Sequence, residues 1–186
     1  LGLVESRRSV DAKPGGRARR YQLSDPFFAF WLRFVLPYRL SGPSEDHHGE
    51  GEGDHYARSI RPRMDDHLAS VFPRVCRQHM AYDAIETLGA VAREGGSLWG
   101  PGYDLPVAGI LTNGAAYYGA CRWSDSSEGD ASLDEIEAGI RETRYGFGRE
   151  RRLRLVFTGR DPSLELRREV LRRQDAAIID AEALLG

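Results

Sequence analysis

Residues 102–123 read GYDLPVAGILTNGAAYYGACRW, in which two apolar runs, 103–111 and 115–123, are joined at Thr112-Asn113-Gly114. An Asn-Gly pair between two apolar runs is the strongest short signal for a β-hairpin. Helical patterns precede and follow this stretch, and a hairpin held between helices needs cover on both faces of its sheet. The stretch therefore predicts a layered domain built around one hairpin.

The hairpin also carries the polar side chains on which chemistry could depend. Asp104 stands near the start of the first predicted strand, and Ala120 and Arg122 stand near the end of the second. Side chains alternate along a strand, so Ala120 and Arg122 are expected on the same face of the sheet. That face carries one base and no acid.

Length and composition limit the class of protein. The 186 residues suffice for one domain and a fragment of another, and 29% of them are charged, with a formal net charge of -2. The chain begins at Leu1, so we expect it to be the C-terminal part of a longer protein. No apolar run approaches the roughly 20 residues that span a bilayer, and no signal peptide is recognisable, which indicates a cytoplasmic protein without a membrane partner. Cys76 and Cys121 lack metal-site spacing and are expected to be buried thiols.

Lys13 is the only lysine of the chain. A P-loop requires the pattern G-x-x-x-x-G-K-[ST], whose lysine contacts the phosphates. Lys13 lies in AKPGGR, which does not fit this pattern. The 186 residues therefore contain no P-loop.

The first 62 residues are expected to form a hairpin, a helix and a linker. The runs 3–10 and 18–23 flank Pro14-Gly15-Gly16, which predicts a second hairpin that either contacts phosphates through its basic side chains or is simply solvated. Asp25-Pro26 predicts the start of a helix whose aromatic stripe packs in a core and which ends at Pro37. Residues 41–62 are rich in Gly, acids and His; a mobile linker is favoured over a metal site at His47, His48 and His55.

The remaining residues predict alternating helices and strands. Helices are expected at 64–80, with Pro73 inside, and at 82–94, followed by a short strand at Leu98-Trp99. After the hairpin, Asp130 or Ser132 is expected to cap a helix. A strand at 152–158, a helix from 164 to about 173, a strand at 176–179 and a final segment at 181–185 follow. This order predicts an α/β fold with a mixed sheet flanked by helices.

Residues 19–37, RRYQLSDPFFAFWLRFVLP, resemble the hinge motif R-x-Y-x-L-x-D-P-F-x-x-F-W-x-R-F-V of the archaeal-type prokaryotic P-loop (AAA-like) ATPases. In that family the ATPase domain is followed by a winged helix and a C-terminal domain of the restriction-endonuclease-like PD-(D/E)XK superfamily. Gly119 to Trp123 stands where the family has Gly-Glu-Cys-Lys-Trp, and Gly102-Tyr103-Asp104 where it has Glu-Ile-Asp. The segments Leu98-Trp99 and LVFTGRD are also similar to family motifs.

The resemblance implies three parts. Residues 1–24 would be the end, or wing, of a winged-helix domain, and residues 25–62 a hydrophobic linker helix with an acidic, His-containing loop. Residues 63–186 would be the nuclease-like domain. The ATP-binding domain would precede this segment, and its ATP would be bound there.

The resemblance also implies where a nuclease would hold Mg²⁺, and the chain departs from the family at this site. Asp104 keeps the first acidic position, Ala120 stands at the Glu position, Arg122 at the Lys position, and Pro73 at the acid of the first helix. One carboxylate cannot organise Mg²⁺ for phosphodiester hydrolysis, and arginine cannot serve as a base. Arg122 would instead pair with Asp104. An acid that had moved could come from Asp65, Asp66, Glu86 or Asp125.

These expectations describe a non-catalytic accessory domain of a larger ATP-binding protein, with no cofactor in this segment. Its expected partners are its own ATPase domain and DNA. A metal-dependent endonuclease that uses Asp104 to bind Mg²⁺ is the alternative, and a structural domain that forms homo-oligomers is a third. The candidate DNA-binding residues lie in the N-terminal hairpin and on the helix after Pro162: Arg7, Arg8, Arg17, Arg19, Arg20, Arg167, Arg168, Arg172 and Arg173.

Overall fold

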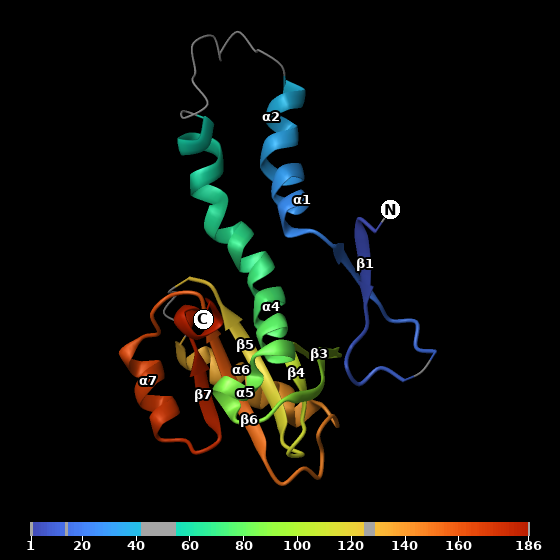
Figure 1. Cartoon of the computed structure of the whole chain (residues 1–186), viewed down its shortest axis with the longest axis vertical. Helices are drawn as coiled ribbons and strands as arrows, with labels where there is room; N and C mark the ends of the chain where they lie inside the picture. The colour runs from blue at the N-terminus through green and yellow to red at the C-terminus, as the bar shows by residue number, and fades with distance from the viewer. Residues whose placement is uncertain (1, 14, 42–54, 125–128, 186) are drawn as a thin grey trace. The chain divides into compact units, whose positions relative to one another are not determined.

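The computed structural model describes residues 2–13, 15–41, 55–124 and 129–185 (Figure 1). They belong to two compact units, one made of residues 1–7 and 19–71 and the other of residues 8–18 and 72–186. The boundary falls inside helix α4 (Met64–Tyr82). The turn of the N-terminal hairpin belongs to the second unit. None of the described helices is long and apolar enough to cross a membrane.

The first unit begins with the predicted hairpin. Strands β1 (Val4–Arg7) and β2 (Arg20–Leu23) pair antiparallel. Helix α1 (Pro26–Phe30) starts where the sequence predicts, because Oδ1 of Asp25 accepts hydrogen bonds from the N–H groups of Phe27 and Phe28 at 2.8 and 3.4 Å. A side-chain acceptor at this position satisfies donors that have no partner within the helix.

The prediction that this helix ends at Pro37 is wrong. A π-helical turn, η1 (Trp31–Val35), follows α1 and leads into α2 (Leu36–Ser41), which contains Pro37. In this turn the N–H of Leu36 donates to the carbonyl of Trp31. A proline ring clashes with the carbonyl four residues earlier in a regular α-helix, and the wider π turn relieves that crowding.

Further along, η3 (Tyr56–Ile60) and η4 (Arg61–Arg63) lead into α4. The predicted aromatic stripe is buried only in part: Phe34 is 2% exposed, whereas Phe27 is 72% exposed. His67 of α4 is also buried, and the edges of its ring meet Phe30 and Phe34 at centroid distances of 5.6 Å. The stripe is therefore a packing surface around Phe34 and not at Phe27.

The second unit contains a five-stranded mixed sheet in the order β3-β4-β5-β6-β7. The predicted hairpin is confirmed as β4 (Tyr103–Leu111) and β5 (Ala116–Arg122), and Gly114 in its turn has φ 86°. The edge strand β3 (Ala92–Gly100) pairs antiparallel with β4, whereas β6 (Arg152–Thr158) and β7 (Ala176–Ile179) continue parallel to β5. The predicted α/β class with a mixed sheet is confirmed.

Two predicted helix boundaries are wrong. The helix expected at 82–94 ends early, because Gly89 closes α5 (Ala84–Leu88) with a left-handed φ of 68° and β3 begins at Ala92. Helix α6 (Gly129–Glu142) starts before the expected caps Asp130 and Ser132. Helix α7 (Leu164–Leu171) begins as expected, with Ser163 Oγ accepting from the N–H of Leu166, and α8 (Ala181–Leu185) follows β7.

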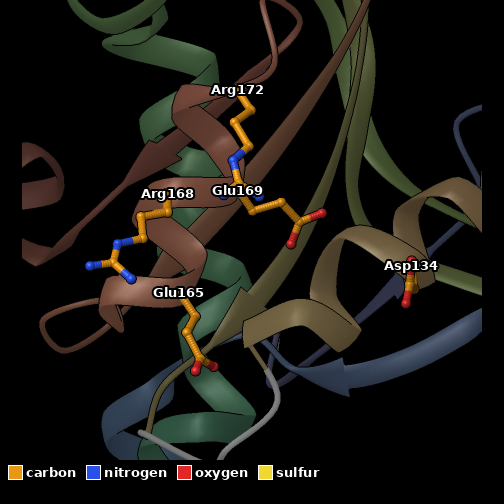
Figure 2. Close-up of a pocket in the computed structure, with 5 residues that line it drawn as sticks. All are labelled: Asp134, Glu165, Arg168, Glu169 and Arg172. Carbon is orange, nitrogen blue, oxygen red and sulfur yellow. The ribbon is translucent and has the colours of Figure 1, made fainter.

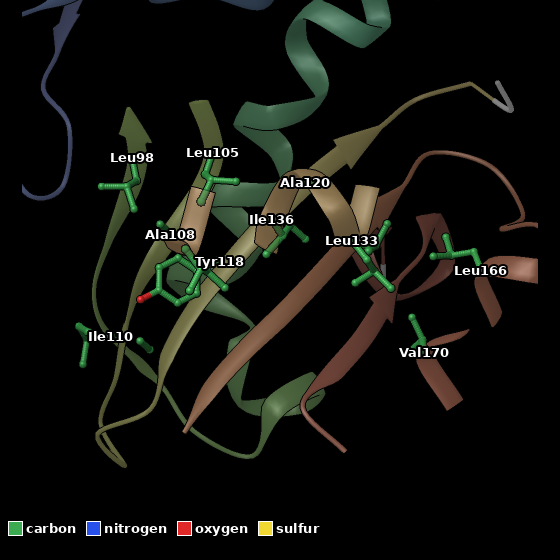
Figure 3. Close-up of a cluster of buried hydrophobic side chains, with 13 residues drawn as sticks. Leu98, Leu105, Ala108, Ile110, Tyr118, Ala120, Leu133, Ile136, Leu166 and Val170 are labelled. Carbon is green, nitrogen blue, oxygen red and sulfur yellow. The ribbon is translucent and has the colours of Figure 1, made fainter. Parts of the chain in front are cut away.

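Helices cover both faces of the sheet. On one face α6 and α7 contribute Leu133, Ile136 and Leu166 to a buried cluster with Tyr118 and Ala120 of β5 (Figure 3). A second cluster joins side chains of α4 and α5 to the opposite face; it includes Phe72, Cys76, Met80, Ala84, Tyr117 and Phe157. Cys76 is buried and Cys121 is partly buried, and both are free thiols, as predicted.

Candidate functional site

Ala120 and Arg122 lie on the face of the sheet that α6 covers. Ala120 is 0% exposed and belongs to the cluster with Leu133 and Ile136 (Figure 3). Nη2 of Arg122 donates to Oε2 of Glu135 on α6 at 2.6 Å. The shared face of Ala120 and Arg122 follows from strand alternation, as predicted. The acid that pairs with Arg122, however, comes from α6.

A β-bulge in β4 decides where Asp104 lies. Gly96 of β3 is opposite Ala108, but Leu98 is opposite Leu105, so two residues of β4 face one residue of β3. The extra residue falls at Pro106-Val107, and a proline inside a sheet is tolerated at a bulge because it donates no ladder hydrogen bond.

The bulge inverts the alternation of side chains in β4. Leu105 packs against α6, where a Cβ added at Gly139 would lie 2.7 Å from Cδ1 of Leu105. Asp104 immediately precedes Leu105 in the strand and therefore points to the opposite face of the sheet. Leu105 and Arg122 share the α6 face, so the structure does not bring Asp104 together with Ala120 and Arg122.

Helix α4 holds the bulge in place from the other face. Nη1 of Arg77 donates to the carbonyl of Pro106 at 2.9 Å and to Oγ of Ser97 at 3.3 Å. Oγ of Ser97 in turn donates to the same carbonyl at 3.0 Å. A bulge leaves backbone groups without ladder partners, and these two side chains satisfy one of them.

The acids proposed as substitutes lie in different parts of the chain, and Asp104 belongs to the second unit. Asp65 and Asp66 belong to the first unit, where Asp66 lies 3.8 Å from Nη2 of Arg33. Glu86 is exposed on α5, and Asp125 lies outside the described residues. Pro73 lies inside α4, at the position where the family resemblance implies an acid.

The described side chains do not fit a divalent metal. Within residues 2–13, 15–41, 55–124 and 129–185, no three His, Cys, Asp or Glu side chains come together as possible ligands. His47 and His48 lie outside this part of the chain, and the ring of His55 stacks on Tyr38 at a centroid distance of 3.9 Å. Mg²⁺ requires near-octahedral oxygen ligands, which Asp104 alone cannot supply.

The basic residues of the N-terminal hairpin are divided between the two units. Arg7, Arg19 and Arg20 belong to the first unit and Arg8 and Arg17 to the second. Arg7 and Arg20 are directly opposite each other in the β1–β2 ladder. Two like charges at opposite positions of a strand pair repel each other.

The basic residues of α7 lie among acids. Arg173 bonds to Glu137 at 3.0 Å, and Arg167 lies 3.8 Å from Asp161. Arg168 and Arg172 line a groove of about 520 Å³, which Figure 2 shows between α7 and Asp134 of α6. Acidic residues of both helices line the same groove: Asp134, Glu165 and Glu169. This surface is mixed in charge.

Glu137 is the centre of an ion-pair network. Its Oε1 accepts from Nε of Arg154 and from Nη1 of Arg173, both at 3.0 Å, and Arg154 also bonds to Asp175 at 2.6 Å. Burial pushes the pKa of Glu137 upward, but the hydrogen bonds and charges of Arg154 and Arg173 outweigh burial and lower its pKa overall. The network joins α6 to β6 and to the segment between α7 and β7, which contains Arg173 and Asp175.

Sequence reasoning missed Glu135, Glu137 and Arg77. Acids on α6 were visible beside the apolar positions Leu133 and Ile136, and a residue beside a buried position often stands at the edge of a helix interface. The partner across that interface cannot be read from one chain segment.

No protein family, curated protein or solved structure matches this chain. The assignment to the ATPase family therefore stays a prediction from the motif in residues 19–37 and the later segments.

Proposed function

We propose that this chain is a restriction-endonuclease-like domain that binds DNA without cleaving it, and that it is an accessory part of a larger prokaryotic ATPase. The order of α4, β3, β4, β5, α6 and β6, with an antiparallel hairpin followed by a parallel strand, supports this fold. The N-terminal hairpin and the helix at Asp25-Pro26 would then be the winged-helix remnant and the linker helix.

One observation supports the absence of cleavage above the others. Ala120 is fully buried against α6, while the bulge directs Asp104 to the opposite face. Hydrolysis of a phosphodiester with Mg²⁺ requires carboxylates on one surface, where they clamp the metal and position the attacking water. Arg122 is neutralised by Glu135 and stays protonated, so it cannot act as a base.

The β1–β2 hairpin is the surface that we propose for DNA. It carries several arginines, of which Arg7 and Arg20 are directly opposite each other in the ladder. Arginines contact phosphates in a geometry that suits bidentate hydrogen bonds, and such contacts give affinity without sequence specificity. On this proposal DNA binding weakens steeply as salt increases.

The test combines cleavage and binding. The chain is incubated with supercoiled plasmid and Mg²⁺ or Mn²⁺, and we expect no nicking by the wild type or by Asp104→Ala. Nicking that Asp104→Ala abolishes would establish the nuclease alternative. We expect the triple variant Arg7→Ala, Arg19→Ala, Arg20→Ala to lose the salt-dependent retention of duplex DNA. Full retention by this variant would refute the hairpin surface.

A further inference from the structure

Phe147 stands on the loop of residues 143–151, which joins α6 to β6 in the second unit. Its side chain is 81% exposed. Glycines with positive φ flank it, Gly146 at 68° and Gly148 at 81°. The N–H of Phe147 donates to the carbonyl of Arg144 at 3.1 Å, and the N–H of Arg149 donates to that of Gly146 at 3.2 Å. Two successive turns therefore present the ring to solvent.

The loop is anchored to the sheet at Tyr145 and Gly146, directly before this ring. The hydroxyl of Tyr145 donates to Oε1 of Glu94 at 3.0 Å, and the hydroxyl of Tyr118 donates to the carbonyl of Tyr145 at 2.6 Å. Burial, and then the hydrogen bond to Glu94, raise the pKa of Tyr145, so its hydroxyl remains a donor. Gly146 packs so closely on Tyr118 that a Cβ would collide with the tyrosine hydroxyl. An exposed aromatic ring is thus held on a fixed backbone.

Three arginines belong to the same loop as Phe147. Arg144 and Arg151 are exposed and Arg149 is partly buried, and none of the three forms a side-chain hydrogen bond or ion pair with another described residue. Glu150 is the acid of the same segment. A groove of about 250 Å³ runs between this loop and the β4–β5 turn; it is lined by Asn113, Gly114, Ala115, Gly148, Arg149, Glu150 and Arg151.

We propose that the loop of residues 143–151 binds an unpaired segment of a nucleic-acid strand, with one base stacked on Phe147 and adjacent phosphates held by Arg144, Arg149 and Arg151. Base–aromatic stacking together with a basic groove is the general means by which proteins bind single strands. The site is at the Ala116 end of β5, whereas Arg122 is at the other end. It does not rest on the function proposed above, which uses the β1–β2 hairpin.

The surroundings of Phe147 favour a nucleotide over an apolar protein partner. A protein hot spot is usually ringed by further packed side chains that exclude water. Here glycines flank Phe147 in the chain and leave its ring 81% exposed, and the arginines of the same loop supply charge of the sign that phosphates require. A base needs only this open face, because each base offers its own flat surface.

The first experiment measures binding of a fluorescein-labelled oligothymidine of about 20 nucleotides, a length that covers sites of the usual size, to the full chain by anisotropy. Phe147→Ala is expected to weaken binding by about 5- to 150-fold, which corresponds to the loss of one stacked base. Tyr82→Ala is the matched control. Tyr82 is also an exposed aromatic residue of the second unit, at 77%, but the next residue is an acid, Asp83. We expect the Tyr82→Ala variant to bind the oligonucleotide as tightly as the wild type. Phe147→Trp should retain affinity and show added emission that the oligonucleotide quenches.

The second experiment separates this site from the hairpin. Arg149→Ala with Arg151→Ala should reduce the slope of log Kd against log salt by about 0.7 for each phosphate that the variant no longer neutralises. The effect of Phe147→Ala should persist in the Arg7→Ala, Arg19→Ala, Arg20→Ala background. The proposal would be overturned if Phe147→Ala bound the oligonucleotide as tightly as the wild type, or if Tyr82→Ala lost as much affinity as Phe147→Ala. It would also be overturned if polyglutamate at the same charge concentration displaced the oligonucleotide.

Discussion

Nη2 of Arg122 and Oε2 of Glu135 lie 2.6 Å apart, which ties the end of β5 to helix α6. The two side chains are 29% and 38% exposed, so solvent screens the pair, and it stabilises the fold by no more than about 1 kcal/mol. The pair matters more for the chemistry available to Arg122 than for the stability of the fold. The guanidinium of Arg122 is already paired with a carboxylate, and the carboxylate of Glu135 is already paired with a cation.

Introducing the nuclease motif that the resemblance implies, with Ala120→Glu and Arg122→Lys, is expected to destabilise the protein without creating a nuclease. Ala120 is 0% exposed, and a carboxylate there would be buried on the face opposite Asp104. We expect the free energy of unfolding to fall by about 3 kcal/mol or more, the scale of an uncompensated buried charge. Urea unfolding and plasmid nicking with Mg²⁺ measure both effects, with Arg122→Lys alone as the control. A stable double variant that cleaves DNA would contradict the placement of Ala120 and Asp104 on opposite faces.

The lowered pKa of Glu137 predicts that the protein loses stability in acid. Its pKa in the folded protein is lowered overall by Arg154 and Arg173, so the folded state binds fewer protons than the unfolded state. This stabilisation is present above the unfolded pKa of about 4.3 and is lost as pH falls through the lower folded pKa. Urea unfolding between pH 6 and pH 3 should show a shallower acid loss for Glu137→Gln, which is less stable at pH 6.

Glu165→Gln is the matched control for this series, because Glu165 is exposed on α7 and forms no ion pair with another described residue. Its acid dependence should follow the wild type. Superimposable curves for Glu137→Gln and wild type would show that the network does not contribute.

The lowered pKa of His67 predicts that its contact with Phe30 and Phe34, in the first unit, is also sensitive to acid. Burial, and then the charge of Arg33, lower the pKa of His67 from its ordinary value, so the neutral ring is favoured between Phe30 and Phe34. The stabilisation is complete above the unfolded pKa of about 6.5 and is lost as pH falls through the folded pKa. NMR titration of the His67 ring proton should give a pKa below that value. A pKa at or above it would contradict the packing of His67 between the two phenylalanine rings.

Gly109 and Gly96 offer a test of the β3–β4 register. A Cβ at Gly109 would collide with the carbonyl of Glu94 and the hydroxyl of Tyr117, whereas a Cβ at Gly96 would meet only Cβ of Val10, at an ordinary 3.7 Å. Gly109→Ala should lower the free energy of unfolding by about 1–3 kcal/mol, as overpacking does. Gly96→Ala should change it by about 0.5 kcal/mol or less. Equal urea midpoints for the two variants would show that the register is different.

Much of the fold could be predicted because its signals are local. Asp25-Pro26 marked the start of α1, and the apolar runs at 152–158 and 176–179 became β6 and β7 with the predicted bounds. The errors have local causes as well. Pro37 was expected to end a helix because nothing in the sequence announces the π turn that accommodates it.

By itself the sequence determined the hairpin around Asn113-Gly114, the mixed sheet and the shared face of Ala120 and Arg122, since turn chemistry and side-chain alternation act between near neighbours. Only the tertiary structure decided that Asp104 faces away from Arg122 and that Glu135 is the partner of Arg122. A bulge is defined by the register of two strands, and an ion pair between a strand and a helix by their packing. Both depend on contacts between residues far apart in the chain, which no pattern along it encodes.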